Sequence, residues 1–214
     1  HHVIVHANRR HDKATAVAAE IAAAGGSAEA VAFDITDADA TAAALDAILA
    51  AGPVQILVNN AGRHADAVFP GMGAKQWHTV MDVNLNGFYN VTQPLTMPML
   101  RTRWGRIVTI TSVAGLVGNR GQVNYAAAKG ALHAATKSLA LELASRNVTV
   151  NAVAPGIIAT EMSDGSFDKA TIERLVPMKR AGQPDEVADL VAFLVSERAA
   201  YITGQILSIN GGMV

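Results

Sequence analysis

The chain has 214 residues, enough for one domain with a buried core, and half of its residues are hydrophobic. Its 17 basic and 18 acidic side chains give a formal net charge of −1, which argues against a broad nucleic-acid surface. Because it has no cysteine, it has no disulfide, thiolate metal site or cysteine nucleophile. No apolar run reaches the roughly 18 residues of a membrane span. We find no signal peptide and expect a cytoplasmic protein.

Short runs of β-branched residues alternate with helical segments along the chain. In chain order we predict a strand at 3–5, a helix at 12–24, a strand at 31–33, a helix capped at 36 or 37 that runs to 51, and a strand at 54–58. There follow a long helix at about 75–103, a strand at 106–111, a helix through residue 125 to about 145, and a strand at 148–153. Helices at 169–175 and 185–196 and a strand at 205–209 complete the order. Pro94 and Pro98 predict a kink or break in the long helix.

This alternation predicts a doubly wound α/β fold, with a parallel sheet, helices on both of its faces and right-handed crossovers. In such sheets, ligands bind beyond the carboxyl ends of the strands. The predicted strands end in polar or Gly- and Pro-containing stretches, namely Asn8-Arg9, Asp34, Asn60-Ala61-Gly62, Ser112 and Pro155-Gly156. We therefore expect these residues to lie along one edge of the sheet.

Three side chains in the segment 112–129 suit proton transfer to or from a ligand oxygen. Tyr125 and Lys129 are four residues apart, which places them one helical turn apart on the same face. A nearby ammonium group favours the phenolate and lowers the pKa of a tyrosine, which can then act as a general acid or base. Ser112 follows a predicted strand and can donate a hydrogen bond to a substrate oxygen. Taken alone, a Tyr-Lys pair at this spacing is more often an ordinary surface pair.

Several motifs together resemble the short-chain dehydrogenase/reductase family over essentially the whole chain: Asn59-Asn60-Ala61-Gly62, Asn84, Ser112, Tyr125-x-x-x-Lys129 and Asn151-Ala152-Val153-Ala154-Pro155-Gly156. Within this family the chain is most similar to the 3-oxoacyl-(acyl-carrier-protein) reductases. The closer similarity lies in the stretches 118–129, 201–205 and 210–213. The resemblance implies a Rossmann-type fold and an NADP-dependent oxidoreductase.

The resemblance also implies a role for each catalytic position. Tyr125 would protonate the carbonyl oxygen, Lys129 would hold the nicotinamide ribose and depress the tyrosine pKa, and Ser112 would orient the substrate oxygen. Asn84 would hold a water molecule that connects the lysine to solvent.

Further positions match residues that bind the cofactor in the family. By this resemblance, Asp34 and the Ile35 backbone would contact the adenine, and the ribose would lie over Asn60, Ala61 and Gly62. The nicotinamide would meet Tyr125 and Lys129 and the segment that contains Pro155, Gly156, Ile158 and Thr160. Each of these stretches has a simpler reading as a strand end or turn when taken alone.

The choice between NAD and NADP depends on the residues after the first predicted strand. An acid there would select NAD through the ribose 2′-hydroxyl, but residues 6–10 include no acid. Asn8 and Arg9, or Arg10, would instead face a 2′-phosphate, which favours NADP. The alternative is that these arginines are solvated surface charges.

One family signature does not occur in these 214 residues, namely the glycine-rich turn that meets the cofactor pyrophosphate. The chain begins at the family's second strand, so we expect roughly 30 further residues of strand, turn and helix ahead of it in the whole protein. The alternative is a truncated form that folds poorly and binds NADP weakly.

The family's other features imply a substrate lid, a partner and an assembly. The variable segment 161–180, with Glu161, Met162, Phe167, Met178 and Lys179, would form the lid. Arg103 and Arg146 match positions beside the site that are thought to receive acyl carrier protein, although they also read as surface charges. We expect a homotetramer, no metal site, no nucleic acid and no membrane partner.

We therefore expect NADPH-dependent reduction of a 3-oxoacyl thioester, linked to acyl carrier protein or CoA, in fatty acid synthesis. One alternative is a dehydrogenase or reductase that acts on a free ketone or alcohol. An alternative of another class is a catalytically silent cofactor-binding protein, against which the presence of all four catalytic residues argues.

Overall fold

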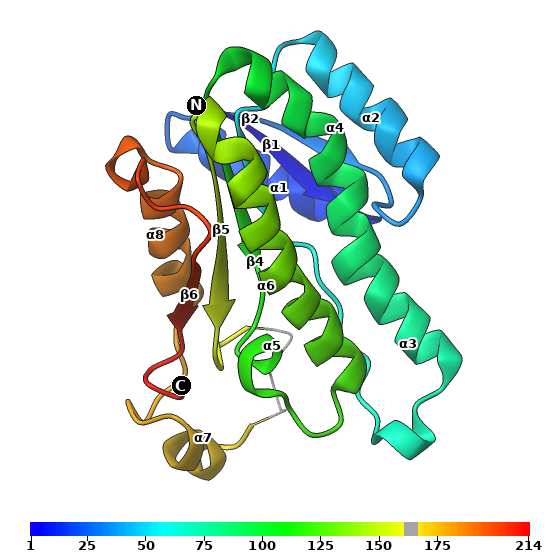
Figure 1. Cartoon of the computed structure of the whole chain (residues 1–214), viewed down its shortest axis with the longest axis vertical. Coiled ribbons are helices and arrows are strands. Elements are labelled where there is room, and N and C mark those ends of the chain that lie inside the picture. The colour runs from blue at the N-terminus through cyan, green and yellow to red at the C-terminus, as the bar shows by residue number, and fades with distance from the viewer. Residues whose placement is uncertain (161–166) are drawn as a thin grey trace.

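Six strands and eight α-helices make up most of the structure, a computed structural model that describes residues 1–160 and 167–214 (Figure 1). The strands in this described part are β1 (His2–Ala7), β2 (Ser27–Ala32), β3 (Ile56–Asn59), β4 (Gly105–Ile110), β5 (Val148–Pro155) and β6 (Ile206–Ile209). The helices are α1 (His11–Ala23), α2 (Ala38–Ala50), α3 (Ala74–Met81), α4 (Gly87–Thr102), α5 (Ala114–Val117), α6 (Val123–Leu143), α7 (Lys169–Leu175) and α8 (Pro184–Leu194). Short turns of other helical types are η1 (Phe69–Gly71), η2 (Asp82–Asn86), η3 (Ala144–Arg146) and η4 (Glu197–Ala199).

All strand pairs are parallel, which confirms the predicted α/β class. The strands form two sheets, with orders β1-β2 and β3-β4-β5-β6, rather than one continuous sheet as expected. The register in the larger sheet pairs Ile107 with Leu57 on one side and with Val150 on the other. The two sheets are separate because β1 pairs with β2 and β3 pairs with β4, and the described residues contain no strand that joins β1 to β3.

Helices cover both faces of the larger sheet, as the doubly wound pattern predicts (Figure 1). Successive strand residues point to opposite faces. Ile107 packs with Leu95 of α4 and Leu143 of α6, whereas its neighbour Val108 packs with Leu194 of α8. The central strands β4 and β5 are therefore buried on both sides. This burial fixes the positions of the segments that follow their carboxyl ends, which begin near Ser112 and Gly156.

Helix boundaries largely follow the capping and turn signals in the sequence. Asp37 caps α2, and its Oδ1 accepts a hydrogen bond of 3.0 Å from the Ala40 N–H. Helix α1 ends just before Gly25, whose φ of +84° is in the left-handed region that favours glycine. Helix α7 spans residues 169–175, as predicted.

The long predicted helix at 75–103 is interrupted, but not at its prolines as expected. Helix α4 continues through Pro94 and Pro98, and the irregularity lies earlier, in the π-helical turn η2. There, Asn84 Nδ2 donates hydrogen bonds to the main-chain oxygens of Val80 at 2.8 Å and Arg63 at 2.7 Å. These bonds tie the turn to the loop after β3 and stabilise the widened helical turn. None of the helices described is long and apolar enough to span a membrane.

Candidate active site

Tyr125 and Lys129 lie one turn apart on α6, as their spacing predicts. Lys129 Nζ is 5.6 Å from the centre of the Tyr125 ring and donates a 2.9 Å hydrogen bond to the main-chain oxygen of Ile110. This oxygen is at the carboxyl end of β4. The lysine is only 3% exposed, so its charge is held inside the protein next to the tyrosine.

Ser112 follows β4, and its side chain lies close enough to Tyr125 to lower the pKa of the phenol, against the effect of burial. Its Oγ also accepts a 3.1 Å hydrogen bond from the Ala114 N–H, which fixes the side chain at the start of α5. Two hydroxyl groups are thus held next to each other. A carbonyl oxygen placed between them could accept a hydrogen bond from both.

Asn84 is buried and lies on the other side of Lys129. A Cβ atom built on Gly62 would be 3.2 Å from Asn84 Oδ1 and 3.3 Å from Lys129 Nζ, so these two side chains meet around the glycine. The structure therefore brings Asn84, Ser112, Tyr125 and Lys129 together. The Asn84 amide is occupied by main-chain groups of Arg63 and Val80, so it also ties the loop after β3 to η2.

The ionisation of the pair differs from the expectation that the lysine lowers the tyrosine pKa. Burial raises the pKa of Tyr125 above its usual value, the Ser112 side chain opposes this, and the Asp66 carboxylate raises it further. Burial also lowers the pKa of Lys129, from 10.5 to about 8. This direction is opposite to the one expected for Tyr125, and its largest cause is desolvation of the phenolate by burial.

The predicted adenine-side residues meet where β1 and β2 end. Asp34 accepts hydrogen bonds from the main-chain N–H and hydroxyl of Thr36, at 3.0 and 2.8 Å, which together hold its pKa low. The Asn8 side chain and the Arg9 charge lower it further, so these three side chains are neighbours. Ile35 is buried, and its main-chain oxygen accepts a 2.9 Å hydrogen bond from Asn90 Nδ2 on α4.

Other predicted cofactor residues lie on segments that border Ser112. The Val113 N–H donates a 2.9 Å hydrogen bond to the Pro155 oxygen, and the Gly156 N–H donates a 3.0 Å hydrogen bond to Ile209. Ile158 forms a parallel bridge with Gly182, and Thr160 is exposed at the end of the first described range. Asn60 and Ala61 are exposed after β3, and Asn60 lines an apolar hollow together with side chains of α8.

These residues fit a nicotinamide cofactor. The Lys129 ammonium has three N–H donors, one of which is used by Ile110, so two remain for ribose hydroxyls. Gly62 presents no side chain where Lys129 and Asn84 meet, which leaves the lysine accessible from that side.

Two predictions about the surroundings are corrected or fall outside the described residues. Arg103 and Arg146 precede β4 and β5, so a strand length separates them from Ser112, and they do not lie beside the site of their own chain. In the lid segment 161–180, Glu161 and Met162 lie outside the described residues. Met178 is 61% exposed, and the apolar inner surface of the lid stays a prediction.

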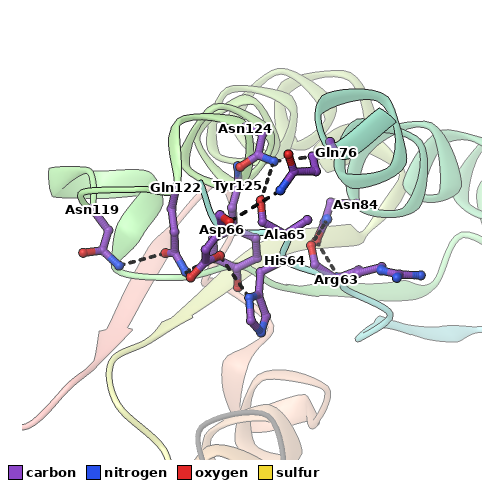
Figure 2. A network of polar contacts seen from close by, with 10 residues as sticks. All are labelled: Arg63, His64, Ala65, Asp66, Gln76, Asn84, Asn119, Gln122, Asn124 and Tyr125. Atoms are coloured by element: carbon purple, nitrogen blue, oxygen red, sulfur yellow. Dashed lines mark hydrogen bonds and ion pairs between the residues drawn. The ribbon is translucent and has the colours of Figure 1, made fainter. Parts of the chain in front are cut away.

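A polar network beside Tyr125 was not predicted from the sequence (Figure 2). It links the loop after β3 to the start of α6 and includes His64, Ala65, Asp66, Gln76, Asn119, Gln122 and Asn124. The one feature of the sequence that could have indicated this network is the run of polar residues directly after the strand end at Asn60-Ala61-Gly62. Among residues 1–160 and 167–214, no group of three or more His, Cys, Asp or Glu side chains could hold a metal ion.

Comparisons with known proteins agree with this fold and site. A family model described as enoyl-(acyl carrier protein) reductase matches residues 2–214. A 3-oxoacyl-[acyl-carrier-protein] reductase, FabG, from Aggregatibacter actinomycetemcomitans is 45% identical over 213 residues, which are 99% of this chain and 88% of the relative. The enzyme of the same name from Staphylococcus aureus strain Mu50 is 44% identical over 94% of this chain and 83% of its own length. A 3-oxoacyl-[acyl-carrier-protein] reductase from Synechocystis is 44% identical over 99% of this chain and 86% of its own length.

The chain therefore belongs to the short-chain dehydrogenase/reductase family. It is an oxidoreductase that uses a nicotinamide cofactor.

Proposed function

We propose that this protein reduces a 3-oxoacyl thioester to the 3-hydroxyacyl thioester in fatty acid synthesis, with NADPH as the reductant and acyl carrier protein as the carrier. The observation that carries this proposal is that the hydroxyl groups of Ser112 and Tyr125 lie near each other, with the buried ammonium of Lys129 one helical turn from Tyr125. The relatives, which are 42 to 45% identical to this chain, are named as 3-oxoacyl-[acyl-carrier-protein] reductases, and this supports the choice of substrate.

The chain's own residues bind and protonate the substrate oxygen. Ser112 and Tyr125 donate hydrogen bonds to the 3-oxo oxygen, which polarises the carbonyl group. A bound reduced nicotinamide supplies the hydride that the carbonyl carbon accepts. Tyr125 gives its proton to the oxygen, and the adjacent Lys129 charge stabilises the phenolate that remains. The raised pKa of Tyr125 keeps it protonated, and ready to donate, at neutral pH.

Proton return to Tyr125 is assigned to Lys129 and a water molecule near Asn84. Since the Asn84 side-chain amide is already bonded to Arg63 and Val80, we assign this water to the main chain of the η2 turn rather than to the amide.

A comparison of substrates tests the reaction. We expect the acetoacetyl thioester of N-acetylcysteamine to be reduced with a kcat/KM at least tenfold above that of butan-2-one or of the crotonyl thioester. The crotonyl compound tests enoyl reduction, which the description of the matching family names. If the protein reduced butan-2-one but not the thioester, it would be a reductase of free ketones, and this proposal would be wrong. No oxidation of NADPH with any of them would favour a silent cofactor-binding protein.

Preference for NADPH is assigned to Arg9, with Asn8 beside it. Arg9 lies next to Asp34 at the carboxyl end of β1, whereas Arg10 pairs with Asp12 on α1 at 3.1 Å. We expect Arg9→Ala to raise the KM for NADPH about tenfold and to leave the KM for NADH unchanged. Arg10→Ala is the matched control. Equal effects of Arg9→Ala on both cofactors would contradict the assignment.

The proposal also includes a cytoplasmic homotetramer that accepts the acidic carrier protein. Apolar side chains on the outer faces of α4 and α6 support self-association, since Met97 is 52% and Leu141 84% exposed. Light scattering of the purified protein would measure its mass. Charge reversal of Arg103 and Arg146, assayed with carrier-linked and N-acetylcysteamine substrates, would show whether these basic groups contact the carrier.

A further inference from the structure

The imidazole of His64 is held in a fixed orientation next to Tyr125. Its Nδ1 is 3.0 Å from Asp66 Oδ1, and the two rings are nearly perpendicular, at 80°, with 6.4 Å between their centres. Figure 2 shows both residues in the polar network between the loop after β3 and the start of α6. Asp66 raises the pKa of Tyr125, so its carboxylate lies close enough to act on the phenol group.

Asp66 is itself fixed from the opposite side. Gln122 Nε2 donates hydrogen bonds of 3.1 and 2.9 Å to its two oxygens, and Asn119 Nδ2 donates a 2.9 Å hydrogen bond to Gln122 (Figure 2). The Asp66 carboxylate is therefore held by hydrogen bonds on the side away from His64, which supports the orientation of the imidazole.

This arrangement determines which ring nitrogen of His64 is available to a ligand. A carboxylate only accepts hydrogen bonds, so the Nδ1 that faces Asp66 carries the proton. In its neutral form the imidazole then presents a lone pair at Nε2, for which the described residues provide no partner. His64 is thus a hydrogen-bond acceptor for an N–H group of a ligand bound at Tyr125.

The proposed substrate contains one such group at a suitable distance. In a 3-oxoacyl thioester carried on a pantetheine arm, six bonds separate the reacting carbon from the first amide nitrogen. An extended chain of six bonds spans about 7 Å. Because the centres of the two rings are only 6.4 Å apart, a chain of this length is long enough for the amide to reach His64 when the carbonyl group meets Tyr125. The carbonyl oxygen of the thioester has no proton to donate, so it cannot form a hydrogen bond with the lone pair of His64 Nε2.

We propose that His64 Nε2 accepts a hydrogen bond from the first amide N–H of the pantetheine arm, which makes His64 a residue that selects pantetheine-linked substrates. This inference rests on the proposed function and adds to it the part of the substrate that the chain recognises. The arm is common to acyl carrier protein and CoA, so the contact favours both over a simple thioester.

The test compares two substrates that differ only in this N–H group. One is the acetoacetyl thioester of N-acetylcysteamine, and the other is the matching acetoxyethyl thioester, in which oxygen replaces the N–H. We expect the wild-type enzyme to prefer the amide by about tenfold in kcat/KM, mostly through KM, because the contact is made equally in the ground and transition states. His64→Phe keeps a ring but no acceptor, and should reduce this preference to less than twofold.

Two further variants separate recognition from a structural effect. His64→Gln keeps an acceptor oxygen and should restore part of the preference, whereas His78→Phe changes an exposed histidine on α3 and should leave it intact. If His64→Phe kept the wild-type preference for the amide and an unchanged melting temperature, this inference would be wrong, while the proposed function would still stand. A wild type that reduces neither thioester would overturn the proposed function, and this inference with it.

Discussion

Tyr125 is partly buried in the first turn of α6, and burial raises the pKa of its hydroxyl. A free tyrosine already has a pKa near 10, so a higher value makes proton release harder until charge develops on the substrate oxygen. Lys129 acts at that moment, because it stabilises the phenolate only once it forms. The pair is thus suited to donating a proton during reduction rather than to holding a standing phenolate.

Removal of the Tyr125 hydroxyl tests this assignment most directly. We expect Tyr125→Phe to lower kcat by about a thousandfold, the usual scale of a lost general acid, with an unchanged melting temperature. The rate of NADPH oxidation with the acetoacetyl thioester measures this loss. Wild-type turnover in the variant would show that another group protonates the substrate.

Lys129 should reduce stability while it supports activity. Burial lowers its pKa from 10.5 to about 8 in the folded protein, so the unfolded chain binds more protons in this pH range, and stability should rise as the pH rises through it. Below about pH 8 the buried charge costs roughly 3 kcal/mol. We expect Lys129→Met to be inactive, yet to raise the free energy of unfolding by that order at pH 7.

Urea denaturation at pH 7 and above pH 10 measures this effect, since the gain of Lys129→Met should shrink as the wild-type lysine becomes neutral. Lys137→Met is the control, because Lys137 is exposed on the same helix and should change stability little. A less stable Lys129→Met at pH 7 would mean that the hydrogen bond to Ile110 outweighs the cost of burial.

At the scale of elements, α5 and α6 approach each other closely enough to position Ser112. A Cβ atom on Gly115 would be 2.8 Å from the main-chain carbon of Lys129 and 2.9 Å from the Gly130 nitrogen. Main-chain atoms cannot move aside as a flexible side chain would. We therefore expect Gly115→Ala to push α5 from α6 and to displace Ser112 from Tyr125.

The expected result for Gly115→Ala is a loss of about 1–3 kcal/mol of stability and at least a tenfold loss of kcat. Gly71→Ala is the matched control, since a Cβ there would have its nearest contact at 4.0 Å, with Val68. Thermal melting and thioester turnover measure both variants. Normal stability and rate in Gly115→Ala would show that the loop accommodates the methyl group.

Local signals predicted most elements, whereas features that depend on distant partners could not be predicted. The Asp37 cap and the span of α7 follow from neighbouring residues. The interruption at η2 involves a hydrogen bond from Asn84 to Arg63, 21 positions away, whereas the prediction placed the break at the two prolines. Asp66 accepts a hydrogen bond from Gln122, which is 56 positions later in the sequence, so the network around His64 could not be predicted from neighbouring residues.

The same limit applies to the candidate site. The spacing of Tyr125 and Lys129 indicated their shared face, but the direction of the tyrosine pKa depends on burial, which a sequence does not show. Arg103 and Arg146 matched family positions, yet their places at the amino ends of β4 and β5 became clear only from the fold.

At the scale of the whole molecule, a buried arginine connects β4 to the C-terminal part of the chain, at the edge opposite Ser112. Arg106 is fully buried, its guanidinium is 4.4 Å from the centre of the Trp104 ring, and it is 3.4 Å from Glu197 in η4. Trp104 Nε1 donates a 2.6 Å hydrogen bond to the same carboxylate. Glu197 thus satisfies two groups that lie more than 90 positions earlier.

Loss of this carboxylate should weaken the fold without changing the chemistry. We expect Glu197→Ala to lower the free energy of unfolding by about 1–2 kcal/mol, because it leaves a buried charge with fewer partners, and to leave kcat within twofold. Glu142→Ala, which removes an exposed carboxylate on α6, should be neutral. Equal stability of the two variants would mean that water replaces the Glu197 carboxylate as a partner of the Arg106 guanidinium.

The π-helical turn η2 has a consequence for how this protein can change through insertion or deletion. An α-helix turns by about 100° per residue, so a deletion that made this turn regular would rotate everything after it by roughly that angle. Leu95 and Met99, which now pack in the core, would point elsewhere, and Asn84 would leave the site. Neighbouring positions can accept substitutions one at a time, but the number of residues between Val80 and Leu95 cannot change without cost to both packing and chemistry.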